Sequence, residues 1–267
     1  MIRRIETPAI VLATRDTGES DLLVTLLARR TGRTTGMAKA AKKSKKRFVN
    51  VFDRGNIITV SMYRPRKREL FFIEDASLID DCRGPYADME ALARTSVVLE
   101  LVLELAPEEE PTPTLFDDLE MSLLALSTRG AREDVMWMYL VRLLEKLGLA
   151  PFLTGCVRCG KKAEPEDRTF FSPASGGAIC TGCHDPRDGG MHLSAGTRRS
   201  ISKSLSTPPD RMGRIILTGE TRSEIRKALP LFIHHQVGKR LASLDFFERY
   251  IVEKENNGAR RSSSKIS

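Results

Sequence analysis

Four of the five cysteines stand in two close pairs, a spacing at which thiolates bind metal ions. Cys156 and Cys159 form the first pair and Cys180 and Cys183 the second, giving the pattern Cys-x2-Cys-x20-Cys-x2-Cys. Each pair can present two thiolates to one ion from a tight turn, and a glycine in or beside each pair gives that turn its backbone freedom. Four thiolates close a tetrahedral shell and leave no position for water or substrate. The sequence therefore predicts one structural Zn²⁺.

The other interpretations of these cysteines are weaker. A redox Cys-x-x-Cys motif is expected to stand alone, whereas this motif is duplicated. His184 follows Cys183 directly and could replace one thiolate, so it stays open as a fourth ligand. Cys82 has no partner nearby in the sequence and is expected to be a small core residue.

A second feature with binding chemistry is the stretch from residue 29 to residue 68. It holds fourteen Lys and Arg against one acid, Asp53, so its net charge is +13. A nearby polyanion would relieve the repulsion among these cations, and nucleic acid is the commonest polyanion in a cell. The alternative to nucleic-acid binding is that the stretch is a solvated loop without a binding partner. The predicted nucleic-acid contacts are Arg29, Arg33, Lys39, Lys42, Lys43, Lys45, Lys46, Arg47, Tyr63, Arg64, Arg66 and Arg68.

Within this predicted site the cations would contact phosphates, and Tyr63 would stack on a base. Phe71 and Phe72 lie close by in the sequence, and we expect them in a protein core rather than at the surface. The stretch offers no side chain that would distinguish one base from another. Binding is therefore expected to show little sequence preference.

Strand-forming segments surround the basic stretch. Apolar or β-branched runs occur at residues 9–13, 22–27, 33–39, 55–63 and 69–79. Glycine-bearing turns separate several of them, which is typical of a small all-β barrel or sandwich. Five strands in this length favour an OB-fold over residues 1–80, with 39–47 as the loop between the third and fourth strands.

The middle of the chain differs from its two ends in net charge and in the spacing of its apolar residues. Residues 81–150 have a net charge of −8, whereas 1–80 and 151–267 carry +8 each. Apolar residues recur at helical spacing in 87–106, 114–130 and 133–147, and the run Pro107-Glu-Glu-Glu-Pro-Thr-Pro113 separates the first two. Thr114 is the expected N-cap of the second helix. We expect the carboxylates to form a solvated face without acid–base catalysis.

The last third reads as helical again, with helices expected at 223–238 and 244–255 and a disordered tail at 256–267. Pro230 should kink the first helix or mark its start. His234 and His235 would point about 100° apart on that helix, which favours packing over shared metal binding. Whether a basic region at residues 198–227 forms a second nucleic-acid contact stays open; its residues are Arg198, Arg199, Lys203, Arg211, Arg214, Arg226 and Lys227.

These parts predict an α+β protein. An N-terminal five-stranded OB-fold barrel, 1–80, is followed by a helical domain in two parts, 81–150 and 191–255, with a four-cysteine zinc module inserted at 151–190. No apolar run approaches the roughly eighteen residues of a membrane span, and the N-terminus lacks the features of a signal peptide. We therefore expect a cytoplasmic protein.

The order of these parts resembles that of the bacterial RecO family of recombination mediators. The likeness includes the turn Thr17-Gly18-Glu19-Ser20-Asp21, the cysteine module and the closing pattern His-His-x-x-Gly-x-x-Leu-x-Ser. The family commonly has a Pro-Lys-Ser-like core before the fourth strand, where this chain has the more lysine-rich segment 42–47. Some members lack the cysteines, which is consistent with a structural zinc.

The resemblance implies an accessory protein that performs no covalent catalysis. It would bind single- and double-stranded DNA, anneal complementary strands and work with RecR. Indirectly it would help RecA displace single-stranded DNA-binding protein in the bacterial cytoplasm, at the nucleoid. The alternative is a zinc-ribbon factor that binds RNA in association with the ribosome or transcription. A nuclease is disfavoured, because the sequence shows no carboxylate cluster for Mg²⁺ and no glycine-rich phosphate loop.

Overall fold

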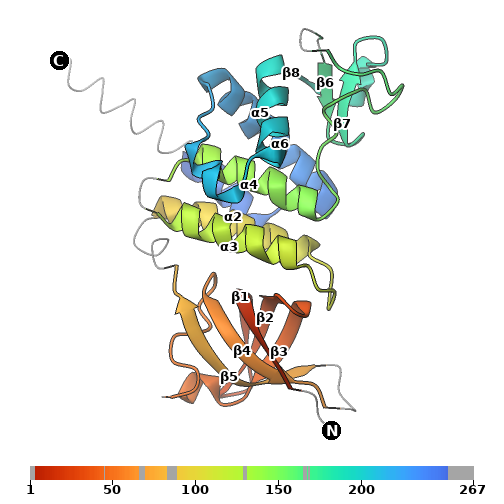
Figure 1. Ribbon diagram of the computed structural model, residues 1–267. Coiled ribbons are helices and arrows are strands. Elements are labelled where there is room, and N and C mark those ends of the chain that lie inside the picture. The colour runs from red at the N-terminus through yellow and green to blue at the C-terminus, as the bar shows by residue number, and fades with distance from the viewer. Residues whose placement is uncertain are drawn as a thin grey trace, which may run out of the picture.

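The computed structural model describes residues 4–44, 46–65, 70–82, 89–128, 131–164, 167 and 169–251. A β-barrel forms one end of the molecule, helices form the middle, and a small sheet lies at the far end (Figure 1). Lys45, Arg66 and Arg68 lie outside the described residues, as does the tail predicted to be disordered. Within the described residues, every helix is too short or too polar to cross a lipid bilayer.

The N-terminal region is a closed five-stranded barrel, which confirms the predicted fold class. Its strands follow the order β1-β2-β3-β5-β4, with β3 and β5 parallel and the other neighbours antiparallel. The strands are β1 (Arg4–Thr17), β2 (Asp21–Ala28), β3 (Gly32–Ala38), β4 (Ile57–Tyr63) and β5 (Phe71–Asp80). β1 is longer than predicted because its first half pairs with β4 and its second half with β2.

Strand alternation divides the barrel's side chains between two cores. Along β4, Ile58, Val60 and Met62 point into the barrel, as expected for side chains that alternate every second residue. On the side that faces the helices, Ile10 and Leu27 join the helical core instead. The barrel is therefore attached to the helices by buried apolar contacts.

The helical body is built around one central helix. α4 (Glu133–Lys146) is buried along almost its whole length, and the Trp137 ring meets Phe247 edge-on at 5.9 Å between ring centroids. Residues 242–251 form a further helix. The other elements are α2 (Met89–Leu105), α3 (Pro113–Ser127), α5 (Ala195–Ser206), α6 (Gly219–Val237) and the short 3₁₀ turns η1 (Ala41–Lys43), η2 (Pro186–Asp188) and η3 (Pro209–Arg214).

Two helix starts differ from the prediction. α3 begins at Pro113 rather than after Thr114, because proline suits the first turn, where its missing N–H costs nothing. α6 begins earlier than predicted because the Thr218 side chain accepts a hydrogen bond from the Thr221 N–H. Pro230 lies inside α6, so it does not mark the start of that helix.

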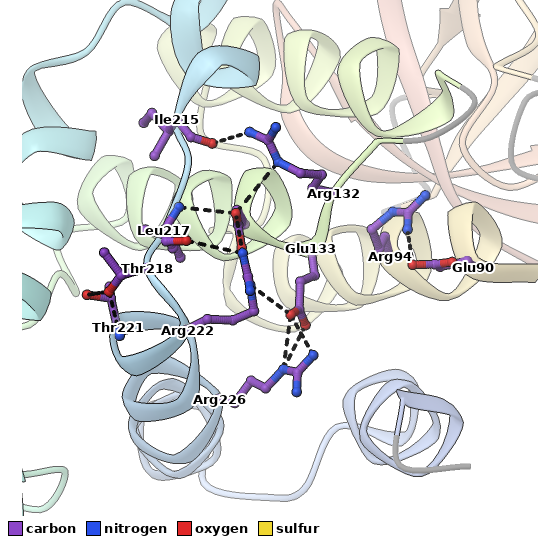
Figure 2. A network of polar contacts seen from close by, with 11 residues as sticks. Glu90, Arg94, Arg132, Glu133, Ile215, Leu217, Thr218, Thr221, Arg222 and Arg226 are labelled. Atoms are coloured by element: carbon purple, nitrogen blue, oxygen red, sulfur yellow. Dashed lines mark hydrogen bonds and ion pairs between the residues drawn. The ribbon is translucent and has the colours of Figure 1, made fainter. Parts of the chain in front are cut away.

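The expectation that the acidic carboxylates form a solvated face is wrong for three of them. Asp134 is fully buried and accepts hydrogen bonds from Arg222 Nε at 2.7 Å and the Leu217 N–H at 3.1 Å. Glu133 pairs with Arg226 at 2.6 Å, as Figure 2 shows. On α3, Asp118 accepts hydrogen bonds from Arg142 at 3.0 and 3.1 Å. All three of these acids, Asp118, Glu133 and Asp134, are buried. These acids hold the helices together.

Candidate metal centre and nucleic-acid interface

The four paired cysteines come together at the far end of the molecule. Their sulfur atoms all lie within 4.8 Å of one another, and the Cys159 and Cys180 sulfurs are 3.8 Å apart. A tetrahedron with Zn–S bonds of about 2.3 Å has S···S edges of about 3.8 Å, so the arrangement fits a single tetrahedral ion. The cysteines can therefore hold one metal ion.

Two tight turns place these sulfurs. In the first, the Gly160 N–H donates to the Cys156 carbonyl at 2.9 Å, and Gly160 has the left-handed φ of 72° that such a turn needs. In the second, the N–H groups of Cys183 and His184 both donate to the Cys180 carbonyl, at 3.1 and 3.0 Å. Cys180 is the last residue of β7 (Gly177–Cys180). This strand belongs to a three-stranded sheet with β6 (Thr169–Ser172) and β8 (Met191–Leu193).

The electrostatics of the cluster also fit a cation. Burial raises the pKa of the Cys156 thiol, but hydrogen bonds from the backbone at Cys180, Cys159 and Arg158 outweigh it and lower that pKa to about 6. Hydrogen bonds with the Cys159 and Cys180 sulfurs raise the pKa of Cys183 to about 12. The first thiolate forms readily, whereas a further one beside it is disfavoured. A bound cation would allow all four to ionise.

His184 is not among the gathered ligands. Its ring stacks on Phe170, with 3.6 Å between centroids and 16° between planes. Among the described residues, metal-ligating side chains gather in one group, the four cysteines. His234 lies in the last turn of α6, and burial lowers its pKa. Cys82 is buried, as predicted, and burial followed by the nearby Asp80 raises its pKa to about 12.

The basic residues of this stretch that the structure describes lie on the barrel strands and their loops, and at least four of these are paired with acids. Their partners are acids outside the basic stretch, so the local count of +13 overstates the free charge. The ion pairs are Arg29–Asp117 at 3.2 Å, Arg33–Glu108 at 3.1 Å, Lys42–Asp16 at 2.5 Å and Arg64–Glu109. The expectation that these cations are uncompensated is therefore wrong for these four. The acids that pair with them come from β1, from the loop before α3 and from α3 itself.

Three lysines stay exposed and make no ion pair with the described residues. Lys43 and Lys46 lie in the loop between β3 and β4, and Lys39 lies at its start, with its Nζ 5.3 Å from the centre of the Phe72 ring. Arg47 is also exposed, donates to the carbonyls of Glu74 and Lys39, and packs on Phe48. Among the described residues of the predicted site, these cations are exposed and make no ion pair.

The turn between β1 and β2 holds this lysine loop in place, a role that we did not predict. The Asp21 carboxylate accepts a hydrogen bond from the Ala40 N–H at 2.7 Å. The Ser20 carbonyl accepts one from the Lys42 N–H at 3.0 Å. Ala40 has a left-handed φ of 53°, which the Asp21 hydrogen bond helps to maintain.

Tyr63 is half-buried at the end of β4. Its ring stacks on Phe72, with centroids 5.8 Å apart. Phe71 points into the barrel core, as expected, and the Arg64 guanidinium lies 4.0 Å from its ring centre. Phe72 is also buried, as expected, with 8% of its surface exposed, and its ring contacts Tyr63 and Lys39.

The C-terminal basic region is less available than its sequence indicates. Arg198 is buried and donates to the carbonyls of Glu164 and Asp167, and Arg226 pairs with Glu133. These two arginines are used inside the protein. The exposed cations of the region are Arg199, Lys203, Arg211, Arg214 and Lys227.

Comparison with known proteins agrees with this architecture. The family profile described as recombination protein O N terminal matches residues 1–81, and that for recombination protein O C terminal matches 86–245. The protein named DNA repair protein RecO of Syntrophus aciditrophicus (strain SB) is 30% identical over 241 residues, covering 90% of this chain and 93% of that protein. Its namesake from Myxococcus xanthus (strain DK1622) is 31% identical over 249 residues, covering 92% and 97%. The chain therefore belongs to the RecO family of DNA repair proteins.

Proposed function

We propose that this protein is a recombination mediator that binds single- and double-stranded DNA without sequence preference and anneals complementary strands. The observation that carries the proposal is that Lys39, Lys43 and Lys46, in and beside one barrel loop, are all exposed. Lysines bind phosphates as point charges and carry no information about the base. The family membership makes DNA the expected polyanion.

The physical mechanism is charge neutralisation. Each lysine that contacts a phosphate releases counterions from the strand, which favours binding at low salt. Two strands that approach each other repel through their phosphates, and a cationic barrel face would reduce that repulsion. Tyr63 and Lys39 both contact the Phe72 ring, so Tyr63 and the neighbouring Arg64 would support a base or a phosphate beside that lysine.

The proposal includes partners and a cellular place. RecR would act with this protein, single-stranded DNA-binding protein would coat the substrate, and RecA would be loaded indirectly as a result. The relatives that carry the name DNA repair protein RecO support a role of this kind. We place the protein in the bacterial cytoplasm, at the nucleoid, as an accessory factor without covalent catalysis.

The metal centre has a structural part in the proposal. Cys156, Cys159, Cys180 and Cys183 would hold one Zn²⁺, since four sulfurs at tetrahedral spacing suit that ion. Bound zinc would neutralise the thiolates and fix the two turns. We treat 151–190 as the zinc module, 1–80 as the DNA-binding barrel, and 81–150 with 191–255 as the body that carries both.

A comparison of DNA with RNA tests this function against an RNA-binding zinc-ribbon factor. Single strands of the same length and sequence would be titrated at matched salt. We expect both to bind through phosphates, but only DNA strands to be annealed faster than they anneal spontaneously. Faster annealing or much tighter binding of RNA alone would favour the RNA-binding function.

A further inference from the structure

The acidic loop before α3 docks directly on the barrel. The backbones of Arg33, in β3, and Glu108 form an isolated parallel β-bridge. In this bridge the Glu109 N–H donates to the Arg33 carbonyl at 2.9 Å. Arg33 Nε in turn donates to the Ala106 carbonyl at 2.7 Å. A side chain at Gly32 would overlap the Glu110 carbonyl, so only glycine allows the loop this close.

This docking places two carboxylates on cations of the predicted DNA site. Glu108 pairs with Arg33 at 3.1 Å, and Glu109 pairs with Arg64. Glu109 has a left-handed φ of 56°, a conformation uncommon for residues with a side chain. The backbone is thus held in an unusual form at the residue whose carboxylate reaches Arg64.

We propose that the Glu109 carboxylate occupies a phosphate position on Arg64, so that DNA must displace it in order to use this arginine. The inference rests on the proposed DNA-binding function. Carboxylate and phosphate both bind the guanidinium fork, so one can replace the other. The Glu109 side chain is 46% exposed and that of Arg64 is 34% exposed, so the exchange needs a side-chain rotation and leaves the docked backbone in place.

Arg33 is less able to make this exchange than Arg64. Its side chain is 22% exposed, and its Nε remains bonded to the Ala106 carbonyl, which fixes the guanidinium against the loop. The Glu108 side chain is 74% exposed and would leave easily, but its departure would make little more of the Arg33 guanidinium available to DNA. The sequence predicted both arginines as DNA contacts, whereas the structure separates a structural Arg33 from an exchangeable Arg64.

The consequence is that the acidic loop lowers DNA affinity below what the cations alone would give. A protein that brings strands together and then releases the duplex benefits from an internal competitor for phosphate. The competitor also makes DNA binding less sensitive to salt. The phosphate replaces a carboxylate that is already paired with Arg64, so binding adds no new ion pair at this arginine.

The test compares Glu109→Gln with Glu110→Gln in the full-length protein. Glu110 lies in the same loop and makes no ion pair with the described residues, so both variants lose one negative charge but only the first frees Arg64. With a single-stranded oligonucleotide at about 0.1 M salt, we expect E109Q to bind about fivefold more tightly than the parent. The slope of log binding constant against log salt concentration should steepen by about 0.7. E110Q should stay within about twofold of the parent.

Equal affinity and salt slope in the two variants would overturn the inference and leave the loop as a strut between barrel and helices. If E109Q unfolds more easily than the parent, E109N gives the same comparison, since asparagine tolerates the left-handed backbone better. A parent protein that fails to bind DNA would refute the proposed function itself. A parent that binds DNA, combined with equal variants, would refute only the competitor.

Discussion

Alanine at Lys42, Lys43, Lys45 and Lys46 together is expected to weaken single-stranded DNA binding by several hundredfold at about 0.1 M salt. The estimate follows from losing up to four phosphate contacts, each of which adds about 0.7 to the log–log salt slope. Because Lys42 also pairs with Asp16, we expect the slope to fall by at least about 2.1, the share of three lysines, but by less than the full amount of about 2.8. Fluorescence anisotropy over a range of salt concentrations measures both quantities.

The matched control removes four cations from other surfaces. Alanine at Lys161, Lys162, Lys239 and Arg249 lowers the net charge equally but leaves the barrel unchanged. This variant should keep the parent's salt slope within error. An unchanged slope in the lysine-loop variant, or equal losses in both, would mean that the loop between β3 and β4 is not the binding surface.

Serine at Cys156 is expected to remove the zinc and the order of the small sheet. Cys156 is the most buried of the four ligands, and three sulfurs leave the tetrahedral shell open. Metal binding is coupled to folding in such modules, with about 10–16 kcal/mol available from zinc in isolated fingers. Zinc content should fall from one per chain to nearly none, and amide protection should be lost in β6 and β7 but kept in α4.

The control for the metal site is Cys82→Ser, which changes the buried cysteine outside the cluster. It should keep one zinc per chain. Because the proposed zinc is structural and far from the barrel (Figure 1), Cys156→Ser should retain the parent's DNA salt slope. A full zinc complement in the Cys156 variant would contradict the proposed ligand set.

The sequence alone predicts what depends on local spacing. Alternation along residues 57–63 reflects the two faces of β4, and the Cys-x2-Cys spacing brings two sulfurs together within one turn. For the same reason Gly238 correctly marks the end of α6, since a left-handed residue is required there. These features are determined by neighbours a few residues apart.

Long-range pairing could not be read in this way. Asp134 resembles any surface acid in sequence, yet Arg222 and the Leu217 N–H, more than eighty residues away, bury and satisfy it. Arg64 likewise counts as a free cation until the fold brings Glu109 onto it. Charge counts along a chain therefore overestimate a binding surface whenever the fold supplies acids from elsewhere.

Annealing of complementary DNA strands coated with single-stranded DNA-binding protein tests the proposed function most directly. The rate would be followed by strand-specific fluorescent labels, with the parent protein, the lysine-loop variant and the four-cation control. We predict that the parent and the control accelerate annealing well above the spontaneous rate, whereas the lysine-loop variant does not. Annealing by the parent at the spontaneous rate, or equal acceleration by the lysine-loop variant, would contradict the proposal that this barrel brings DNA strands together.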